Sequence, residues 1–362
     1  YLNVLGRHSF NDANIYARAN AHQGINYVNA YWDGTDFHFG DGDGVAANSL
    51  AVLDIAGHEY AHAVTEYTAG LIYAYESGAL NESFSDIAGT CVELYAQPDG
   101  RSLYPAMSPG FSDWLCGEDS WLRSMALRDL RNPRNTLTVG AGNEQPSRYH
   151  GTYWYYGSGD NGGVHYNSGV QNFFFYLLSE GGSGENDGIV YNVTGIGWTN
   201  AARVAYRALT VYCTPSTDYR TVRSAWASAA EDLDTNWVRN VEQAWSVVGM
   251  SVVTITPENG VTFRGPAGGP FTPSSQSFAV SNGSAEAMSW AIWPSESWSD
   301  MWPTNGTLAA GSRTNVTIQI NAAANGLSLG AYTNWLTFSN SSESVLQVRP
   351  VALRIGVGDY FT

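Results

Sequence analysis

The chain has 362 residues, of which 44% are hydrophobic, and its net charge at neutral pH is −16. This length is sufficient for two or more domains with buried cores. The negative charge argues against nucleic acid as a partner and suits calcium binding and secretion. No apolar run reaches the roughly 18 residues that a bilayer-spanning helix needs. Tyr1 begins no signal peptide, so we expect a mature extracellular chain without a membrane span.

The first predicted element is a short β-hairpin between residues 27 and 39. Aromatic residues alternate along this stretch on both sides of Asp33-Gly34. An Asp-Gly pair between two alternating runs is typical of the tight turn that joins paired strands. We therefore expect a small β structure before the helical part of the chain.

A helical segment with the sequence HEYAH follows, from His58 to His62. Residues four apart lie on one face of a helix, so His58 and His62 can present two imidazole nitrogens to one metal ion, with Glu59 beside it. Taken alone, this spacing fits an accidental pattern on an exposed helix about equally well. A catalytic zinc ion takes three protein ligands and leaves one position to water, so a second helix must bring the third ligand.

The next predicted helix has the sequence SGALNESFSDIAGTCVELYA. Its apolar side carries Ile87, Cys91 and Leu94, while Glu82 and Asp86 share another side. We assign Glu82 as the third zinc ligand. Asp86 is assigned as the acceptor that holds a ligand imidazole in one tautomer, because a metal-bound histidine normally donates its other N–H group.

Helical patterns continue to about Val248 and contain two further features. Asp160 and His165 lie five residues apart in a Gly-rich turn, where the carboxylate could orient the imidazole and keep it cationic. From the residues alone, a capping or core role for His165 is the favoured interpretation. The apolar helix NFFFYLLSEGG is expected in the core, and the sequence GGSGEND after it is expected to be a loop.

After the helical part, the pattern changes to short alternating strands separated by Gly, Asn, Pro and Ser. Strands at this spacing predict an antiparallel β-sandwich over residues 251–362. We expect Trp290 and Trp293 to fill its interior, because both lie within one predicted strand. Trp298 and Trp302 lie in an irregular stretch and are the better candidates for a contact surface.

Beyond the HEYAH sequence, the chain resembles the thermolysin-like (gluzincin) zinc metallopeptidases from about Val4 to Gly249. The resemblance is carried, in order, by NAYWDGTDFHFGDGDG, HEYAHAVTEYTAGLIY, ESGALNESFSDIAGT, DNGGVHYNSGV and RALTVYCTPSTDYRTVRSAW. It implies an α+β multidomain protein with a mainly α-helical zincin catalytic domain over residues 1–250, which contains the short N-terminal hairpin. The all-β sandwich would follow, and its segment RGPAGGPFTPSSQSFAVSNGSAEAMSWAI is similar to immunoglobulin-like modules of bacterial secreted enzymes.

The resemblance also implies a role for each residue of the predicted metal site. His58, His62 and Glu82 would bind one catalytic zinc ion, and Glu59 would be the base that removes a proton from the attacking water. The implied activity is the hydrolysis of internal peptide bonds in proteins. This chemistry agrees with the ligand set derived from the residues, because zinc makes water a nucleophile near neutral pH.

Further residues would stabilise the reaction by the same resemblance. Tyr73 and His165 would donate hydrogen bonds to the oxyanion, with Asp160 orienting His165. Water attack on an amide produces a negative oxygen, and donors aimed at that oxygen typically contribute about 3–4 kcal/mol each. The resemblance thus reverses the interpretation of His165 that its sequence context favours.

Five residues are expected at the substrate. The predicted hairpin would pair with the substrate backbone at Asn29 and Ala30, a mode in which the main chain supplies most of the affinity. Arg123 would contact a substrate carbonyl near the first primed-side pocket. Leu122 and Ile55 would form the apolar wall of that pocket, so a large hydrophobic residue is expected after the scissile bond. Without the resemblance, Arg123 would be a surface residue and Leu122 and Ile55 ordinary core residues.

One or two structural calcium ions are also implied. Calcium takes six to eight oxygen ligands, and any one of these acids by itself is more typical of a solvated charge. The expected carboxylate ligands are Asp54, Glu93, Asp113 and Glu118, with main-chain oxygens near Phe111 and Leu115. The connection from Glu93 to Asp113 is longer than in the relatives. After Glu118 the chain has no room for the separate calcium loop of the family.

Family members begin with a β-rich lobe, whereas this chain starts inside the later part of the family pattern. We therefore expect most of that lobe to be missing. The expected partners are protein or peptide substrates, together with a separate N-terminal lobe or a propeptide. One wall of the substrate cleft would then be open, with shallower pockets on the unprimed side.

The cysteines and the function leave alternatives open. Cys91 and Cys116 flank two of the proposed calcium ligands and could form a disulfide with Cys213 unpaired, or all three could be buried thiols. The leading function is a secreted zinc endopeptidase. The alternatives are a cell-surface or matrix binding protein with a structural zinc site, and an inactive zymogen fragment. A structural zinc site needs no base beside the metal, so Glu59 favours the enzyme.

Overall fold

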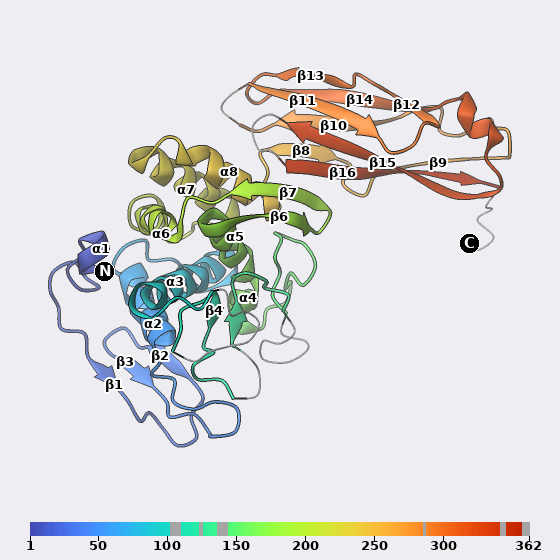
Figure 1. The fold of residues 1–362 in the computed structure, drawn as a ribbon. Helices are drawn as coiled ribbons and strands as arrows, with labels where there is room; N and C mark the ends of the chain where they lie inside the picture. Colours follow the sequence, from blue (N-terminus) through green and yellow to red (C-terminus); the bar gives the residue numbers. More distant parts are fainter. Residues whose placement is uncertain (102–109, 123–125, 136–143, 285–286, 341–344, 357–362) are drawn as a thin grey trace. The chain divides into compact units, whose positions relative to one another are not determined.

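The protein is described by a computed structural model that covers residues 1–101, 110–122, 126–135, 144–284, 287–340 and 345–356 (Figure 1). It divides into two compact units. Unit 1 comprises Tyr1–Gly182 and Val193–Met250, and unit 2 comprises Ser183–Asn192 and Ser251–Thr362. Within the described ranges, none of the helices combines the length and the apolar character that crossing a membrane requires.

Unit 1 is mainly helical. Its helices are α1 (Leu2–Leu5), α2 (Leu53–Glu66), α3 (Tyr75–Ala96), α4 (Asp160–Asn167), α5 (Gly169–Glu180), α6 (Trp198–Arg207), the π-helix η1 (Ala208–Tyr212), α7 (Tyr219–Leu233) and α8 (Trp237–Val247). The predicted core helix is α5, and its Phe174 is fully buried. The Phe174 ring stacks on Trp245 of α8 at a centroid distance of 3.9 Å and packs edge-on against Trp226 of α7. The core position of this helix is therefore confirmed.

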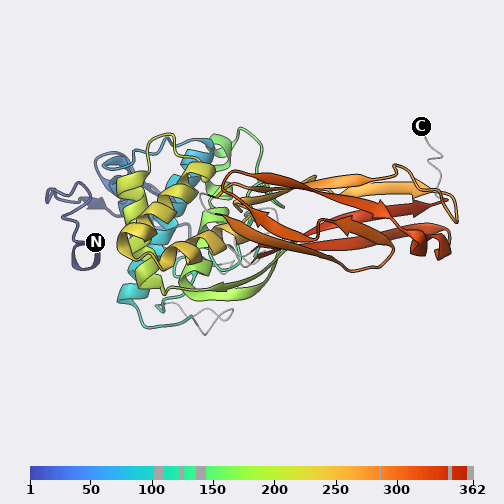
Figure 2. The same cartoon turned by 90° about the horizontal axis from the view of Figure 1, so that it is seen from above.

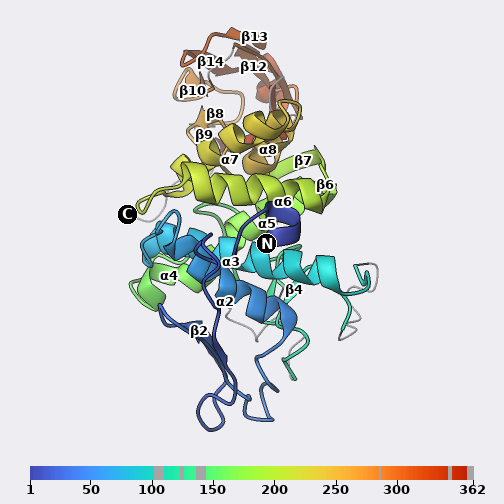
Figure 3. The ribbon, with the colours of Figure 1, turned by 90° about the vertical axis from the view of Figure 1, so that its left-hand side faces the viewer.

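Helices α2 and α3 pack side by side with unusually close backbones (Figure 3). A Cβ atom on Gly89 of α3 would lie 2.3 Å from the carbonyl oxygen of Asp54, and one on Gly57 of α2 would lie 2.9 Å from Gly89 Cα. No side chain fits at such distances, so glycine is required at this crossing. The turn that precedes His58 therefore lies directly against the middle of α3.

Two small sheets accompany the helices of unit 1. The first contains β1 (Ala19–Asn20), β3 (Phe37–Phe39) and β2 (Ala30–Trp32) in that order, with β2 antiparallel to β3. This pair is the predicted hairpin, and β2 is an edge strand of the sheet. The second sheet consists of β4 (Leu115–Cys116) and β5 (Arg128–Asp129), which are antiparallel.

Unit 2 consists of two sheets that share one apolar core. Its strands run along the long dimension of the unit (Figure 2). The four-stranded sheet has the order β12 (Ser299–Trp302), β14 (Arg313–Ile320), β10 (Gln276–Asn282), β8 (Val253–Thr256). The other sheet has the order β13 (Asn305–Leu308), β11 (Met288–Pro294), β15 (Gly330–Asn340), β16 (Val345–Ile355), β7 (Ile189–Thr194), β6 (Gly181–Asn186), and β9 (Val261–Gly265) also pairs with β16. Phe263, Phe278 and Phe338 are among the buried residues. A 3-10 helix, Ala322–Gly326, precedes β15.

The Gly-rich segment after α5 was expected to be a loop, and that prediction is wrong. It forms the hairpin β6–β7, which turns at Asp187-Gly188 with φ values of 47° and 84°. Positive φ at both central residues is typical of a two-residue hairpin turn, and Asp-Gly is a preferred pair for it. Strand β7 pairs with β16, where Val190 lies opposite Leu346. The antiparallel sandwich is also incomplete as a description, because β9 and β16 are parallel.

The tryptophans of unit 2 differ from the expectation in two places. Trp290 is buried as expected, whereas Trp293 is 44% exposed. Successive side chains of a strand point to opposite faces, so residues three apart cannot both face the core. Trp298 was expected at a contact surface but is 5% exposed within the core, and only Trp302 of that pair is exposed.

Candidate active site

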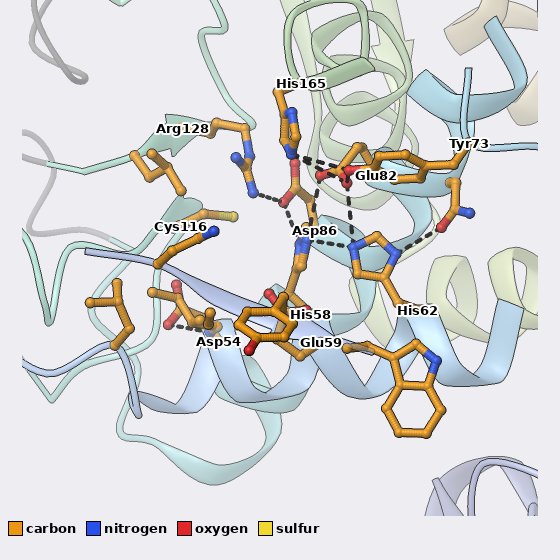
Figure 4. A pocket seen from close by; sticks show the side chains of 18 of the residues that line it. Asp54, His58, Glu59, His62, Tyr73, Glu82, Asp86, Cys116, Arg128 and His165 are labelled. Atoms are coloured by element: carbon orange, nitrogen blue, oxygen red, sulfur yellow. Dashed lines mark hydrogen bonds and ion pairs between the residues drawn. The ribbon is translucent and has the colours of Figure 1, made fainter. Parts of the chain in front are cut away.

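Helices α2 and α3 bring the three predicted zinc ligands together. His58 and His62 direct their Nε2 atoms toward one another at 3.1 Å. Glu82 completes the group, with Oε2 3.4 Å from His58 Nε2 and Oε1 3.3 Å from His62 Nε2. Figure 4 shows the three side chains directed into the same space. Glu82 is 1% exposed, and its Oε2 atom has no hydrogen-bond partner among the described residues. A buried carboxylate oxygen in this state requires a cation or a donor.

The outward-facing nitrogen of each imidazole is also held in place. His58 Nδ1 lies 2.9 Å from Asp86 Oδ1, the contact expected from the sequence. His62 Nδ1 lies 2.8 Å from the side-chain oxygen of Asn81, which the sequence reasoning missed. Asn81 directly precedes Glu82 in the sequence NES, and an amide oxygen at that position was the available signal. Both imidazoles therefore present Nε2 to the shared space.

His165 lies in α4, which begins with a left-handed turn. Asp160, Asn161, Gly162 and Gly163 all have positive φ. A Cβ atom on Gly162 would lie 2.4 Å from the ring of Tyr75, so this turn needs glycine. The turn brings the side chain of Asp160 back to His165 and directs the imidazole toward the ligand group (Figure 4).

The predicted reaction residues around His165 lie together. His165 Nδ1 is 2.6 Å from Asp160 Oδ1, and its Nε2 is 3.2 Å from the Tyr73 hydroxyl. Burial disfavours the imidazolium, but the Glu82 carboxylate and the Asp160 hydrogen bond outweigh it and raise the pKa of His165. The Tyr73 hydroxyl donates a hydrogen bond to Glu82. Burial and the Glu82 charge raise the pKa of Tyr73, so its hydroxyl stays protonated. Both side chains can donate to a negative oxygen.

These groups line a cleft of about 790 Å³. Glu59 follows the first histidine ligand on α2, is buried and lines the cleft. Asn29 and Ala30, at the start of the edge strand β2, lie along another wall. Ile55, one turn before Glu59, contributes apolar surface. An extended peptide that paired with β2 would thus lie next to His58, His62 and Glu82.

Arg128, which the sequence reasoning did not single out, is an arginine of this cleft. Arg128 of β5 lines the cleft and donates from Nη2 to Asp86 Oδ1 at 2.5 Å. Arg123 lies outside the described residues. Leu122 is 49% exposed and does not line the cleft, whereas Leu127 does. The sequence contains two Leu-Arg pairs five residues apart, and the arginine of the second begins β5, which pairs with β4.

A second group of side chains that could bind a metal ion consists of buried acids. One carboxylate oxygen from each of Glu93, Asp113 and Glu118 lies within 4.8 Å of the others, and all three side chains are buried. Asp54 interacts electrostatically with each of them. Burial, followed by repulsion from Glu118, raises the pKa of Glu93, and burial, followed by repulsion from Asp54, raises the pKa of Glu118. The four residues are called the acidic cluster below. They are the predicted calcium ligands, and their burial with mutual repulsion calls for a cation.

The family of the chain is decided by comparison with known sequences. The family model "Thermolysin metallopeptidase, catalytic domain" matches residues 1–66, and "Thermolysin metallopeptidase, alpha-helical domain" matches residues 69–250. The chain belongs to the thermolysin metallopeptidase family. The predicted resemblance is confirmed for the residues that these two models match.

Relatives within the thermolysin family match about two thirds of the chain. Bacillolysin of Bacillus caldolyticus is 41% identical over 254 residues, which are 69% of this chain and 43% of that protein. Thermolysin of Alicyclobacillus acidocaldarius is 41% identical over 254 residues, 69% of this chain and 42% of that protein. This chain therefore spans less than half the length of these relatives. The solved structure of the precursor of protealysin from Serratia proteamaculans is 31% identical, covers 69% of this chain and 74% of its own, and has a TM-score of 0.57.

The thermolysin family is zinc-dependent, and the residues of this chain fit a zinc ion. Zinc binds histidine nitrogen and carboxylate oxygen at about 2.0–2.2 Å, so ligands at the corners of a tetrahedron lie about 3.3–3.6 Å apart. The separations of 3.1, 3.3 and 3.4 Å among His58, His62 and Glu82 are close to that value. The orphaned Glu82 oxygen supports the same assignment.

The cysteines contribute no disulfide. All three lie in described segments and are free thiols. Cys116 is buried and lines the cleft, whereas Cys91 is partly exposed on α3. Of the two alternatives that the sequence left open, free thiols are therefore the observed one, although Cys91 is not fully buried.

Proposed function

We propose that this chain is a zinc-dependent endopeptidase that hydrolyses internal peptide bonds. The observation that carries the proposal is the convergence of two kinds of group on one space in the cleft. His58, His62 and Glu82 offer a three-ligand metal site there, and Tyr73 and His165 aim hydrogen-bond donors at the same place. Metal sites with three protein ligands and an open position are typical of hydrolytic zinc enzymes.

Glu59 is proposed as the general base. It lies next to the ligand His58, is 6% exposed and lines the cleft. Zinc, when bound, would acidify a water molecule and polarise the carbonyl of the scissile bond. Glu59 would accept the proton of that water as its oxygen attacks the carbonyl carbon. The same carboxyl group would then deliver the proton to the leaving nitrogen, which balances the reaction.

Tyr73 and His165 are proposed to stabilise the negative charge that develops on the carbonyl oxygen. Both donors face the Glu82 side of the ligand group, and the fixed orientation of His165 by Asp160 removes the need to rearrange during the reaction. Preorganised donors of this kind contribute about 3–4 kcal/mol each. The raised pKa of His165 favours the charged and stronger donor.

Substrate would bind as an added strand. Strand β2 is an edge of its sheet, so Asn29 and Ala30 can pair with an extended peptide. Arg128 would donate to a substrate carbonyl, since its side chain lines the cleft. Ile55 and Leu127 offer an apolar wall, which supports a preference for a hydrophobic residue after the scissile bond.

The proposal also includes structural calcium, an extracellular location and an accessory domain. The buried acidic cluster supports one or two structural calcium ions, because an ion would neutralise carboxylates that otherwise repel. The net charge of −16 and the likeness to bacillolysin support an extracellular protein. Residues 251–362 would be an accessory domain of immunoglobulin type, supported by its two sheets around one core.

Substitution of Glu59 by glutamine tests the mechanism. The change keeps the size of the side chain and removes its basicity, so kcat on a casein-like or peptide substrate should fall roughly 10²–10⁴-fold. Zinc content should stay at one ion per chain, measured by atomic emission. The matched control is Glu231→Gln on the exposed face of α7, which should keep wild-type activity. Full activity in Glu59→Gln, or no turnover by zinc-loaded wild type, would contradict the proposal.

A further inference from the structure

The acidic cluster contains buried oxygens that the rest of the chain leaves without partners. Both carboxylate oxygens of Glu93 and both of Glu118 have no hydrogen-bond partner among the described residues. Glu93 is fully buried and Glu118 is nearly so. An ionised carboxylate in such a place costs several kcal/mol unless a cation is bound. The order of the segment that carries these acids therefore depends on what occupies the cluster.

Strand β4 lies in the chain between two members of the cluster. Asp113 precedes it by two residues and Glu118 follows it by two. Asp113 Oδ1 also accepts a hydrogen bond of 2.7 Å from the backbone N–H of Leu115, the first residue of the strand. Any cation that fixes Asp113 and Glu118 therefore fixes both ends of β4.

Strand β4 in turn holds β5. Cys116 lies opposite Arg128 in the antiparallel pair. The pairing extends on both sides, because the N–H of Leu127 donates to Cys116 O at 2.7 Å and the N–H of Leu130 donates to Trp114 O at 2.9 Å. Two strands of two residues each cannot sustain a stable hairpin by themselves. The position of β5 must therefore be imposed by its surroundings, of which β4 is the direct neighbour.

Strand β5 carries Arg128, the residue that links the acidic cluster to the active site. The Arg128 side chain reaches Asp86, and Asp86 in turn accepts the hydrogen bond of His58. Figure 4 shows Arg128 and Cys116 on the same side of the cleft, facing Asp86. A second link runs through Asp54, whose carboxylate accepts hydrogen bonds from the N–H of Gly117 and from its own helix α2. Direct contacts thus join the acidic cluster to the substrate cleft.

We propose that a cation bound in the acidic cluster positions Arg128 through β4 and β5, and so controls how tightly the cleft binds substrate. The inference rests on the proposed function for the roles of calcium and of Arg128. Arg128 would be both a substrate contact and the end of this connection. The acidic cluster would then regulate activity as well as support the fold, with a coupling that double-mutant analysis can measure.

Amide exchange tests the connection without any need for turnover. The sample is the zinc-loaded Glu59→Gln protein, which should not cleave itself, with and without calcium at a fixed free zinc concentration. Calcium should slow exchange at the amides of Leu127 and Leu130 by about tenfold or more. The amide of Val222 in α7 should change much less. Equal slowing at Val222, or slowing confined to residues 111–119, would overturn the proposal.

Kinetics of Arg128→Ala provide the second test. In the wild type, calcium at fixed free zinc should lower KM for a peptide substrate by about fivefold or more. In Arg128→Ala, the calcium effect on KM should nearly vanish, because the positioned group is gone. The control Arg207→Ala, which breaks an exposed ion pair with Asp232 outside the cleft, should keep the full calcium effect. An undiminished calcium effect in Arg128→Ala would overturn the coupling.

The two tests separate this inference from the proposed function. A chain that shows calcium-dependent protection at Leu127 and Leu130 but no peptide hydrolysis would refute the endopeptidase function and leave the structural connection intact. A chain that hydrolyses peptides with the same KM in the presence and absence of calcium would keep the function and refute the connection. Glu118→Gln should abolish the calcium-dependent protection, since it removes a ligand of the cluster.

Discussion

Glu82 is the residue on which the site converges. Its two oxygens face His58 and His62, and the same carboxylate lies 3.4 Å from His165 Nε2 and accepts a hydrogen bond from Tyr73. Burial raises the pKa of Glu82, but the charges of His165 and His62 and the hydrogen bonds of His58 and His62 outweigh it and hold that pKa well below its usual range. Glu82 is therefore an anionic ligand at working pH. The donors around it are already directed to the space where the substrate carbonyl would lie.

The Tyr73 hydroxyl can be tested by its removal. Tyr73→Phe deletes one donor to the developing negative charge, and we expect kcat to fall about 10²–10³-fold, with a much smaller change in KM. Steady-state kinetics on a peptide substrate would measure both. Tyr75→Phe is the matched control, because that exposed hydroxyl lies outside the cleft. A change confined to KM would assign Tyr73 to substrate binding.

The sequence predicted local geometry well and long-range geometry less well. The HEYAH spacing and the Glu82-to-Asp86 spacing identified four residues that do meet, because helix periodicity alone decides which side chains share a face. The place of Arg128 in the cleft depends on the pairing of β4 with β5, which joins residues far from the motif. Local pattern contains no information on such a register.

The crossing of α2 and α3 is the element on which the metal site depends. Three ligands come from two helices, so their spacing is set by how closely the backbones approach. Gly89 lies at the contact, and a Cβ atom there would also lie 3.2 Å from the backbone nitrogen of His58. The same position therefore contacts a member of the acidic cluster, Asp54, and the proposed zinc ligand His58.

Gly89→Ala should disturb the site without touching any ligand. The added methyl group must push α2 away from α3, and such overpacking typically costs about 1–3 kcal/mol. We expect zinc affinity, measured by competition with a chromophoric chelator, to fall about tenfold or more while the far-UV spectrum stays helical. Ala88→Ser is the control, because it adds one atom toward an open apolar cavity. Unchanged zinc affinity in Gly89→Ala would refute the role of this contact.

The elements of unit 2 show the same limit at a larger scale. Alternation predicted short strands over residues 251–362, and all four strands of the four-stranded sheet lie in that range. The hairpin β6–β7 was missed because its partner, β16, lies more than 150 residues later in the chain. Alternation itself should have separated Trp290 from Trp293, since an odd spacing places them on opposite faces. The fold class was thus predictable, while sheet membership required the tertiary pairing.

The whole molecule combines a net charge of −16 with a group of buried acids. Self-repulsion of this size destabilises a compact chain unless cations offset it. Burial, followed by Asp129 and Asp54, raises the pKa of Asp113 to about 6, which shows that the ionised cluster is disfavoured in the absence of an ion. Calcium should therefore act on stability most strongly where these acids are ionised.

The stability of the calcium-free protein should accordingly fall as pH rises. A folded-state pKa above the unfolded value of about 4 gives stability that is complete below that pH and lost as pH rises through about 6, which for Asp113 alone amounts to roughly 3 kcal/mol. Urea unfolding of zinc-loaded Glu59→Gln, with free calcium buffered to trace levels, would measure the loss. Millimolar calcium should restore stability near neutral pH and have little effect near pH 4, where the carboxyls hold their protons. Asp113→Asn should remove the Asp113 part of this fall and leave the part due to Glu93 and Glu118. An equal fall in both proteins would show that Asp113 is not a group responsible.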